Sequence, residues 1–235
     1  MQFIKSLIFY LLFYFVVITV LIIAIPTLIM PKKFTLLFGK FLANLIILVL
    51  KVSLNVKVFF HGLDNLKKTE KFFVASAHQS LLETFILQSP LNFPIFILKK
   101  ELLKIPLFGW YLKKLGCISI DRNKISRENL NFSDEVSKVI KDANKTLIIF
   151  PQGTRKSFDD RSKFKKGFAR IYNDLRIACL PVAINSGKVW PKSGGLVPNQ
   201  IIKVSILNIL PSGIEQNKFA TEVEKLIYKE LDKIS

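Results

Sequence analysis

Residues 72–83 read FFVASAHQSLLE: a run rich in Phe, Val and Ala leads into a histidine, and a serine and a glutamate follow. Short runs of this composition are typical of buried strands, and Ser-x-x-Glu is typical of the start of a helix. The stretch therefore predicts a strand, a turn that carries His78, and a helix with Glu83 in its first turn.

The same alternation continues along the rest of the chain. We expect strands at residues 55–61, 71–77, 94–98, 116–121, 146–150, 179–184 and 201–209, and helices at about 80–89, 108–114, 124–143, 165–175 and 217–233. This order predicts an α/β fold with a mixed, largely parallel sheet of about seven strands flanked by helices. We place this domain at residues 53–235, which are enough for one buried core.

Two apolar segments precede the domain. Residues 6–25 carry no charge, and a helix of that length covers about 30 Å, the thickness of a bilayer core. Residues 26–33 contain two prolines and two lysines, and a second apolar segment follows at residues 34–50 with Lys40 inside it. These features predict an N-terminal two-helix membrane hairpin over residues 1–52.

Charge favours a hairpin that enters one leaflet. Two full crossings would place Lys32 and Lys33 outside and Lys40 within the bilayer, and both placements are unfavourable. A re-entrant hairpin avoids these costs, with two full spans as the alternative. A cleaved signal peptide fits less well, because the run is long and no A-x-A site follows. We expect a membrane protein with its catalytic domain on the cytoplasmic face of the inner (plasma) membrane.

Composition also favours a membrane surface. Half of the residues are hydrophobic, and 35 Lys and Arg against 17 Asp and Glu give a net charge of +18. Each basic residue near an anionic membrane contributes about 1 kcal/mol of attraction. Nucleic acid is the other common partner of such charge, but the aromatic and basic clusters of nucleic-acid-binding folds are missing. Cys117 and Cys179 have no metal-ligand neighbours, so we expect free thiols in a reducing compartment.

His78 and Glu83 are the candidate catalytic pair. A histidine at a strand end can face a substrate, and a carboxylate can hold one ring nitrogen so that the other accepts a proton. Glu83 also completes a capping box with Ser80, and both roles are open at this spacing. The alternative for His78 is a structural histidine.

Two later strands end in arginines. Residues 115–122, LGCISIDR, end at Arg122, and residues 146–155, TLIIFPQGTR, end in a glycine turn followed by Arg155. Arginines and a glycine turn at strand ends suit a phosphate group. The alternative for each arginine is a surface ion pair. We expect Lys113 and Lys114 to lie on a solvated face.

In order and spacing, these segments resemble the motifs of the 1-acyl-glycerol-3-phosphate acyltransferases, a family of glycerolipid acyltransferases. The family's HX4D-type motif appears as His78 to Glu83, with Glu in place of Asp. Its Gly-x-Ile-x-Ile-Asp-Arg strand, its Phe-Pro-Glu-Gly-Thr-Arg turn, its Val-Pro-Val strand and its Lys-Lys-Glu-Leu segment look like residues 116–122, 150–155, 180–184 and 98–102. Gln152 replaces the glutamate of the turn and removes a charge beside the expected phosphate site.

The resemblance implies an enzyme of phospholipid biosynthesis, a 1-acylglycerol-3-phosphate O-acyltransferase. It would move a fatty acyl group from acyl-CoA or acyl carrier protein to lysophosphatidic acid (1-acyl-sn-glycerol 3-phosphate) and give phosphatidic acid. His78 would be the general base and Glu83 would orient it. The substrate-binding residues that it implies are Arg122, Arg155 and one of Lys99 or Lys100 for the phosphate, with Gly153 and Thr154 shaping the turn. Neither a metal nor a bound cofactor is required, because the thioester is a co-substrate.

Two other functions remain compatible with the sequence. The acceptor could be another lysolipid, such as a lyso-ornithine lipid or lysophosphatidylcholine, which the change at Gln152 permits. The chain could also be a non-catalytic membrane protein that binds anionic lipids. Replacing His78 by Ala separates an enzyme from a binder, because a binder would hardly respond.

Overall fold

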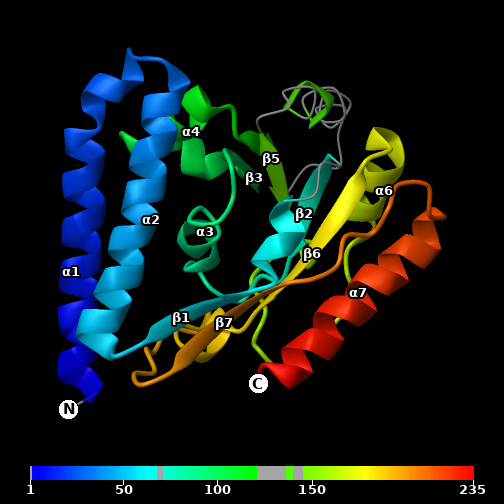
Figure 1. Cartoon of the computed structure of the whole chain (residues 1–235). Coiled ribbons are helices and arrows are strands. Elements are labelled where there is room, and N and C mark those ends of the chain that lie inside the picture. Colours follow the sequence, from blue (N-terminus) through cyan, green and yellow to red (C-terminus); the bar gives the residue numbers. More distant parts are fainter. Residues whose placement is uncertain (1, 68–70, 121–135, 140–144) are drawn as a thin grey trace.

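The computed structural model describes residues 2–67, 71–120, 136–139 and 145–235. Seven strands in this part of the chain form one sheet with the order β1-β7-β6-β2-β5-β3-β4 (Figure 1). The strands are β1 (Lys57–His61), β2 (Phe72–Ser76), β3 (Pro94–Lys99), β4 (Ile118–Ile120), β5 (Thr146–Ile149), β6 (Ala178–Ile184) and β7 (Ile201–Ile206). All seven expected strands are therefore confirmed.

The sheet is mixed and largely parallel, as predicted. The neighbours β6, β2, β5, β3 and β4 all run parallel, whereas β7 pairs antiparallel with β6 and parallel with β1. Parallel strands end at a common edge of a sheet, and ligands of open α/β sheets bind at this edge. The described loops after β2, β5 and β3 therefore meet there.

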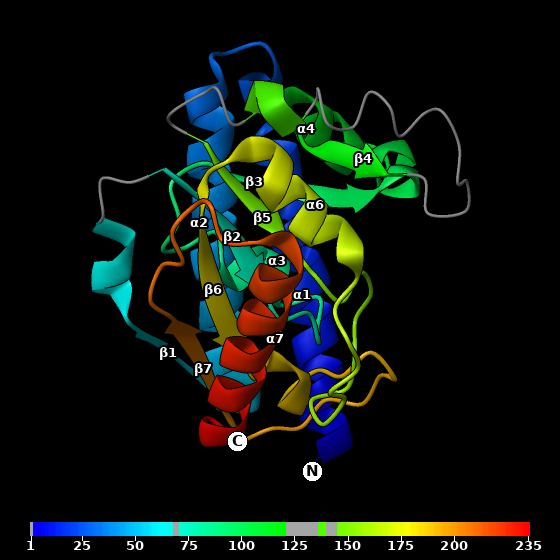
Figure 2. The ribbon, with the colours of Figure 1, turned by 90° about the vertical axis from the view of Figure 1, so that its right-hand side faces the viewer.

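Helices cover both faces of the sheet (Figure 1; Figure 2). One face carries α1 (Gln2–Ile23), α2 (Lys32–Leu54) and the short α3 (Glu83–Ile86), and the opposite face carries α6 (Lys166–Leu175) and α7 (Gln216–Lys233). The other helices whose bounds the structure describes are α4 (Phe108–Leu115) and the 3-10 turns η1 (Ile25–Leu28), η2 (Leu63–Lys67), η3 (Lys100–Lys104) and η5 (Ser186–Lys188). Because both faces are covered, β6 is buried along its whole length.

Aromatic side chains join the second helix layer to the sheet. Phe219 of α7 stacks on Tyr172 of α6 with ring centroids 3.6 Å apart, and it meets Phe73 of β2 at 6.4 Å. Phe73, Phe219 and Tyr172 are almost fully buried. This packing fixes β2, the strand that leads into His78.

Two helices differ from the sequence expectation. The helix expected at residues 80–89 is only α3, because the backbone amides of Gln79 and Ser80 bond the Glu83 side chain in a turn before the helix. Pro90 restricts the residue before it and so disfavours a longer helix. Most of the helix expected at residues 124–143 lies outside the described residues. The part that is described, residues 136–139, is helical.

The N-terminal hairpin is present as predicted. Both α1 and α2 are long and apolar enough to cross a membrane. Large apolar side chains are exposed on its outer surface, among them Leu11, Phe15, Leu37 and Phe41. Its inner surface instead shares the core of the domain: Phe13 lies 5.6 Å from Phe85 and 5.4 Å from Trp190 between ring centroids. The domain boundary at residue 52 remains a prediction, and α2 runs on to Leu54.

Polar contacts fix the hairpin to the domain near both of its ends. The Gln2 amide donates to the carbonyl of Leu196, and the Tyr111 hydroxyl donates to that of Leu21. The Lys114 ammonium donates to three carbonyls in the turn between the helices, those of Thr27, Leu28 and Met30. The expectation that Lys114 is solvated was therefore wrong, because its charge satisfies carbonyls that a helix end leaves without partners.

Candidate active site

His78 and Glu83 form a hydrogen-bonded pair at the carboxyl end of β2. The distance from His78 Nδ1 to Glu83 Oε2 is 2.6 Å. The side chain of His78 is 15% exposed, whereas that of Glu83 is fully buried. A substrate can therefore reach the histidine but not the carboxylate.

The second carboxylate oxygen of Glu83 accepts three further hydrogen bonds. The backbone amides of Gln79 and Ser80 donate to Oε1, each at 2.8 Å, and the Ser186 hydroxyl donates to the same oxygen. A buried charge is costly unless such partners surround it. Oε1 thus accepts the Ser80 amide bond that a capping box would make, although α3 begins only at Glu83 with Leu82 as its N-cap, and Oε2 contacts the histidine.

This arrangement assigns the protons of the imidazole ring. An ionised carboxylate only accepts hydrogen bonds, so Nδ1 must carry the proton that it donates to Glu83. In the neutral ring the other nitrogen, Nε2, then has a free lone pair. The ring also stacks on Phe150, with centroids 4.1 Å apart and planes at 16°, so its orientation is fixed. Nε2 is therefore arranged to accept a proton.

The loop after β5 holds the backbone of His78 on both sides. The His78 amide donates to Gln152 Oε1 at 2.7 Å, and the Lys156 amide donates to the His78 carbonyl at 2.8 Å. Gly153 sits at the turn of this loop with φ +71°, which glycine adopts without strain.

Gln152 is buried and does not extend into an open phosphate site. Its side chain also hydrogen-bonds the hydroxyl of Tyr228, and burial of that phenol raises its pKa to about 12. A neutral amide thus supports the histidine without bringing a second carboxylate next to Glu83. A glutamate at position 152, the family's usual residue, would have placed its charge against the backbone amide of His78.

The basic residues expected to hold a phosphate follow neighbouring strands. Lys99 ends β3 and lies 3.2 Å from Glu101, with its side chain half exposed, and Lys100 begins η3. Thr154 and Arg155 follow β5, which lies between β2 and β3. The sheet order thus brings these residues to the same edge as His78, while Arg122 lies outside the described residues.

The turn after β6 supplies contacts that the sequence analysis missed. Ser186 bonds Glu83, and the Gly187 amide donates to Gln79 Oε1 at 3.1 Å. A Cβ atom at Gly187 would come within 2.8 Å of the Gln79 side chain, so the close approach requires glycine. The sequence could have indicated this turn by its position, because it follows a buried strand, as His78 does.

Comparisons with known proteins identify the family of this chain. The family model described as Acyltransferase matches residues 57–185. The chain is 32% identical over 144 residues to the 1-acyl-sn-glycerol-3-phosphate acyltransferase of Pseudomonas aeruginosa, which covers 61% of this chain and 55% of that protein. It is 27% identical over 205 residues to the enzyme of that name from Streptococcus pneumoniae, covering 81% of this chain and 73% of that protein.

The fold also matches a solved structure. The crystal structure of the 1-acyl-sn-glycerophosphate (LPA) acyltransferase PlsC from Thermotoga maritima superimposes with a TM-score of 0.82 at 22% identity, over 99% of this chain and 97% of that one. The family match covers more than half of the chain and includes His78, Glu83 and the loop that holds them. The chain belongs to the acyltransferase family.

Proposed function

We propose that the protein transfers a fatty acyl group from acyl-CoA or acyl carrier protein to the free hydroxyl of 1-acyl-sn-glycerol 3-phosphate, giving phosphatidic acid. The observation that carries the proposal is the 2.6 Å contact between His78 Nδ1 and a buried carboxylate, which leaves Nε2 to act as a base. The names of the relatives from Pseudomonas aeruginosa and Streptococcus pneumoniae support the choice of acceptor.

The reaction needs no covalent acyl-enzyme. Nε2 of His78 takes the proton of the acceptor hydroxyl as the oxygen attacks the thioester carbonyl carbon. The new C–O bond forms, the C–S bond breaks, and the departing thiolate receives the proton from the imidazolium. Glu83 stabilises the positive charge that grows on the ring, and general-base help of this kind is worth about 100-fold to 10,000-fold in rate.

The phosphate of the acceptor would bind beside the histidine. Arg155 and one of Lys99 or Lys100 extend from the ends of β5 and β3, and Arg122 follows β4 in the sequence. Charge-assisted hydrogen bonds from such residues contribute roughly 1.5 to 3 kcal/mol each. Gly153 and Thr154 would shape the turn that admits the phosphate.

The hairpin would bring the active site to the membrane surface. Hydrogen bonds at Gln2 and Leu21 join α1 to the domain. The apolar outer surface of α1 is therefore held in a fixed position relative to the active site. We place this surface in one leaflet on the cytoplasmic side. The lipid acceptor then arrives from the bilayer, and the donor arrives from water.

The test is an acylation assay with the purified full-length protein in vesicles. Labelled lysophosphatidic acid is supplied with acyl-CoA or with acyl-carrier-protein thioester, and lysophosphatidylcholine and a lyso-ornithine lipid are run in parallel. We expect labelled phosphatidic acid that is lost in His78→Ala and retained in His61→Ala, since His61 lies exposed at the end of β1. Turnover by His78→Ala would remove the proposed base, and preferential acylation of another lysolipid would overturn the acceptor.

A further inference from the structure

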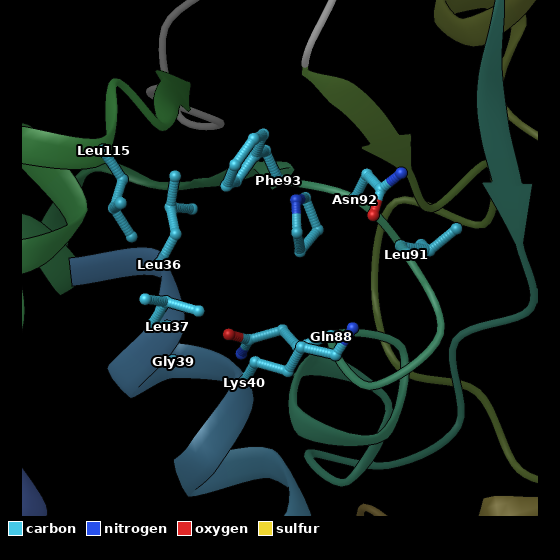
Figure 3. Close-up of a pocket in the computed structure, with 10 residues that line it drawn as sticks. Leu36, Leu37, Gly39, Lys40, Gln88, Leu91, Asn92, Phe93 and Leu115 are labelled. Atoms are coloured by element: carbon cyan, nitrogen blue, oxygen red, sulfur yellow. The ribbon is translucent and has the colours of Figure 1, made fainter. Parts of the chain in front are cut away.

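A second ligand site lies between α2 and the loop before β3. A cavity of about 190 Å³ is enclosed by residues from both elements and by the end of α4: Leu36, Leu37, Gly39, Lys40, Gln88, Leu91, Asn92, Phe93, Pro94 and Leu115. Figure 3 shows Leu36, Phe93 and Leu115 on one side of this space and Gln88 and Lys40 on the other. Most of its lining is apolar, and its polar side chains are those of Lys40, Gln88 and Asn92.

This cavity is distinct from the candidate active site. It adjoins Pro94, the first residue of β3, and so it lies at the amino edge of the parallel strands. His78 follows the carboxyl end of β2, five residues long, so the two sites are separated by about 15 Å, the length of such a strand. The reaction proposed above does not use the cavity.

The apolar space continues toward the core of the hairpin. A smaller cavity of about 80 Å³ shares Gly39, Gln88 and Leu115 with the first and extends between α1, α2 and α4. Gly39 permits this geometry, because a Cβ atom there would lie 2.8 Å from Gln88 Oε1. The two cavities adjoin at Gly39, Gln88 and Leu115, and both have mostly apolar linings, which suit an acyl chain.

One residue of the cavity lining belongs to the apolar outer surface of the hairpin. Leu37, at the rim, is 60% exposed and lies on the outer surface of α2 with Phe41. A ligand can therefore enter from the bilayer. Phe93 in the opposite wall holds φ at +42°, a strained conformation for a bulky residue, and strain of this kind is concentrated at ligand sites.

Lys40 in the cavity lining indicates that the ligand carries a negative charge. It is exposed in an otherwise apolar part of α2, and it forms no ion pair with any described residue. A lysine at the level of the lipid headgroups attracts an anionic lipid by about 1 kcal/mol. The exposed amide of Asn92 lies in the same lining and can donate to the same anion.

We propose that this cavity binds an anionic glycerophospholipid of the bilayer, with one acyl chain between α2 and the residue 88–94 loop and the phosphate at Lys40 and Asn92. The occupant is a lipid because the entrance lies on the exposed apolar surface of the hairpin. The lipid is anionic because the described lining contains one cationic side chain, Lys40, and no carboxylate. This site is independent of the proposed acyl transfer.

The test is photolabelling of the full-length protein in phosphatidylcholine vesicles without donor or acceptor. Phosphatidylglycerol with a diazirine on one acyl chain is the probe, and phosphatidylcholine with the same labelled chain is its neutral counterpart. We expect adducts on residues 36–40 and 88–94, about fivefold more from the anionic probe, the factor for one lysine at an anionic headgroup. Equal labelling by the two probes would overturn the headgroup assignment.

Variants separate this site from general membrane contact. Lys40→Gln should lower labelling by the anionic probe to the neutral level, whereas Lys51→Gln, an exposed lysine on the same helix outside the cavity, should not. Leu36→Trp should fill the cavity and remove adducts from residues 88–94. If the Leu36→Trp protein does not fold, the labelling of Lys40→Gln tests the proposal alone. Labelling confined to the outer surface of α1, or displaced by inorganic phosphate, would overturn the proposal. Because no turnover is measured, failure here leaves the His78 assay unaffected.

Discussion

Arg155 follows β5 beside His78, where a phosphate contact and a structural ion pair predict different kinetics. If Arg155 holds the acceptor phosphate, Arg155→Ala should raise KM for lysophosphatidic acid by about tenfold to a hundredfold, the effect of losing one charge-assisted bond. KM for the acyl donor should change little. Steady-state kinetics with each substrate varied in turn measure both values, and equal increases would show that Arg155 does not act on the phosphate.

Ser186 gives a second prediction, because its hydroxyl is one of three donors to Glu83 Oε1. Ser186→Ala removes this donor, so Glu83 is held less firmly and orients the His78 ring less well. Because the base is then positioned less well, kcat should fall while KM changes little, as steady-state kinetics would measure. Ser193→Ala, an exposed serine in the following loop, is the control. An unchanged kcat with lower stability alone would make Ser186 merely structural.

These two residues show how far the sequence predicts the candidate site. His78, Glu83 and Arg155 could be found because each follows an apolar run that predicts a strand, and strand ends collect ligands. Ser186 could not be paired with Glu83, since 103 residues separate them and only the fold brings them together. Spacing also left the two roles of Glu83 open, whereas the structure assigns one to each oxygen.

Among the elements, the strands were predicted better than the helices and the hairpin turn. The central strands β2, β5 and β6 are buried on both faces and therefore appear as apolar runs. The helix expected at residues 80–89 is short, because its first amides bond a side chain instead of continuing the backbone pattern. Lys114 looked solvated because its partners, near residue 28, lie far away in the sequence.

Lys114 carries a prediction about the hairpin. Lys114→Met removes the donor from three carbonyls and should lower the free energy of unfolding by roughly 1 to 3 kcal/mol. Lys113→Met, next to it and exposed, should have almost no effect. Thermal unfolding of both variants in the same detergent measures the difference. Matching melting temperatures would mean that the turn between α1 and α2 is not held by Lys114.

In the molecule as a whole, the hairpin and the domain share one hydrophobic core. Phe9, Phe13, Ile46, Leu50 and Leu54 are buried against the domain or within the hairpin. Each such side chain contributes about 1.5 to 3 kcal/mol when buried, so together they approach the whole stability of a typical domain. The hairpin therefore stabilises the domain in addition to anchoring it.

Removal of residues 1–54 tests this view. The truncated protein should lose its cooperative unfolding transition and aggregate, because Phe85 and Trp190 lose their partners on α1. Calorimetry of the full-length and truncated proteins in the same detergent gives the comparison. A soluble truncated form with a near-normal melting temperature would show that the hairpin is a separable anchor.

The central claim is that Glu83 sets His78 up as the base. In Glu83→Gln the side-chain oxygen can still accept from Gln79 and Ser80, so the fold should persist. The amide nitrogen then faces Nδ1 as a donor and places the ring proton on Nε2, where it blocks the base.

The deciding measurement is turnover of Glu83→Gln beside Glu83→Asp, with melting temperatures from the same preparations. We predict a Glu83→Gln protein that melts close to wild type but has lost at least about 100-fold in kcat, while Glu83→Asp retains measurable turnover. Near-normal turnover by a stably folded Glu83→Gln protein would contradict the account and leave Glu83 as a helix cap.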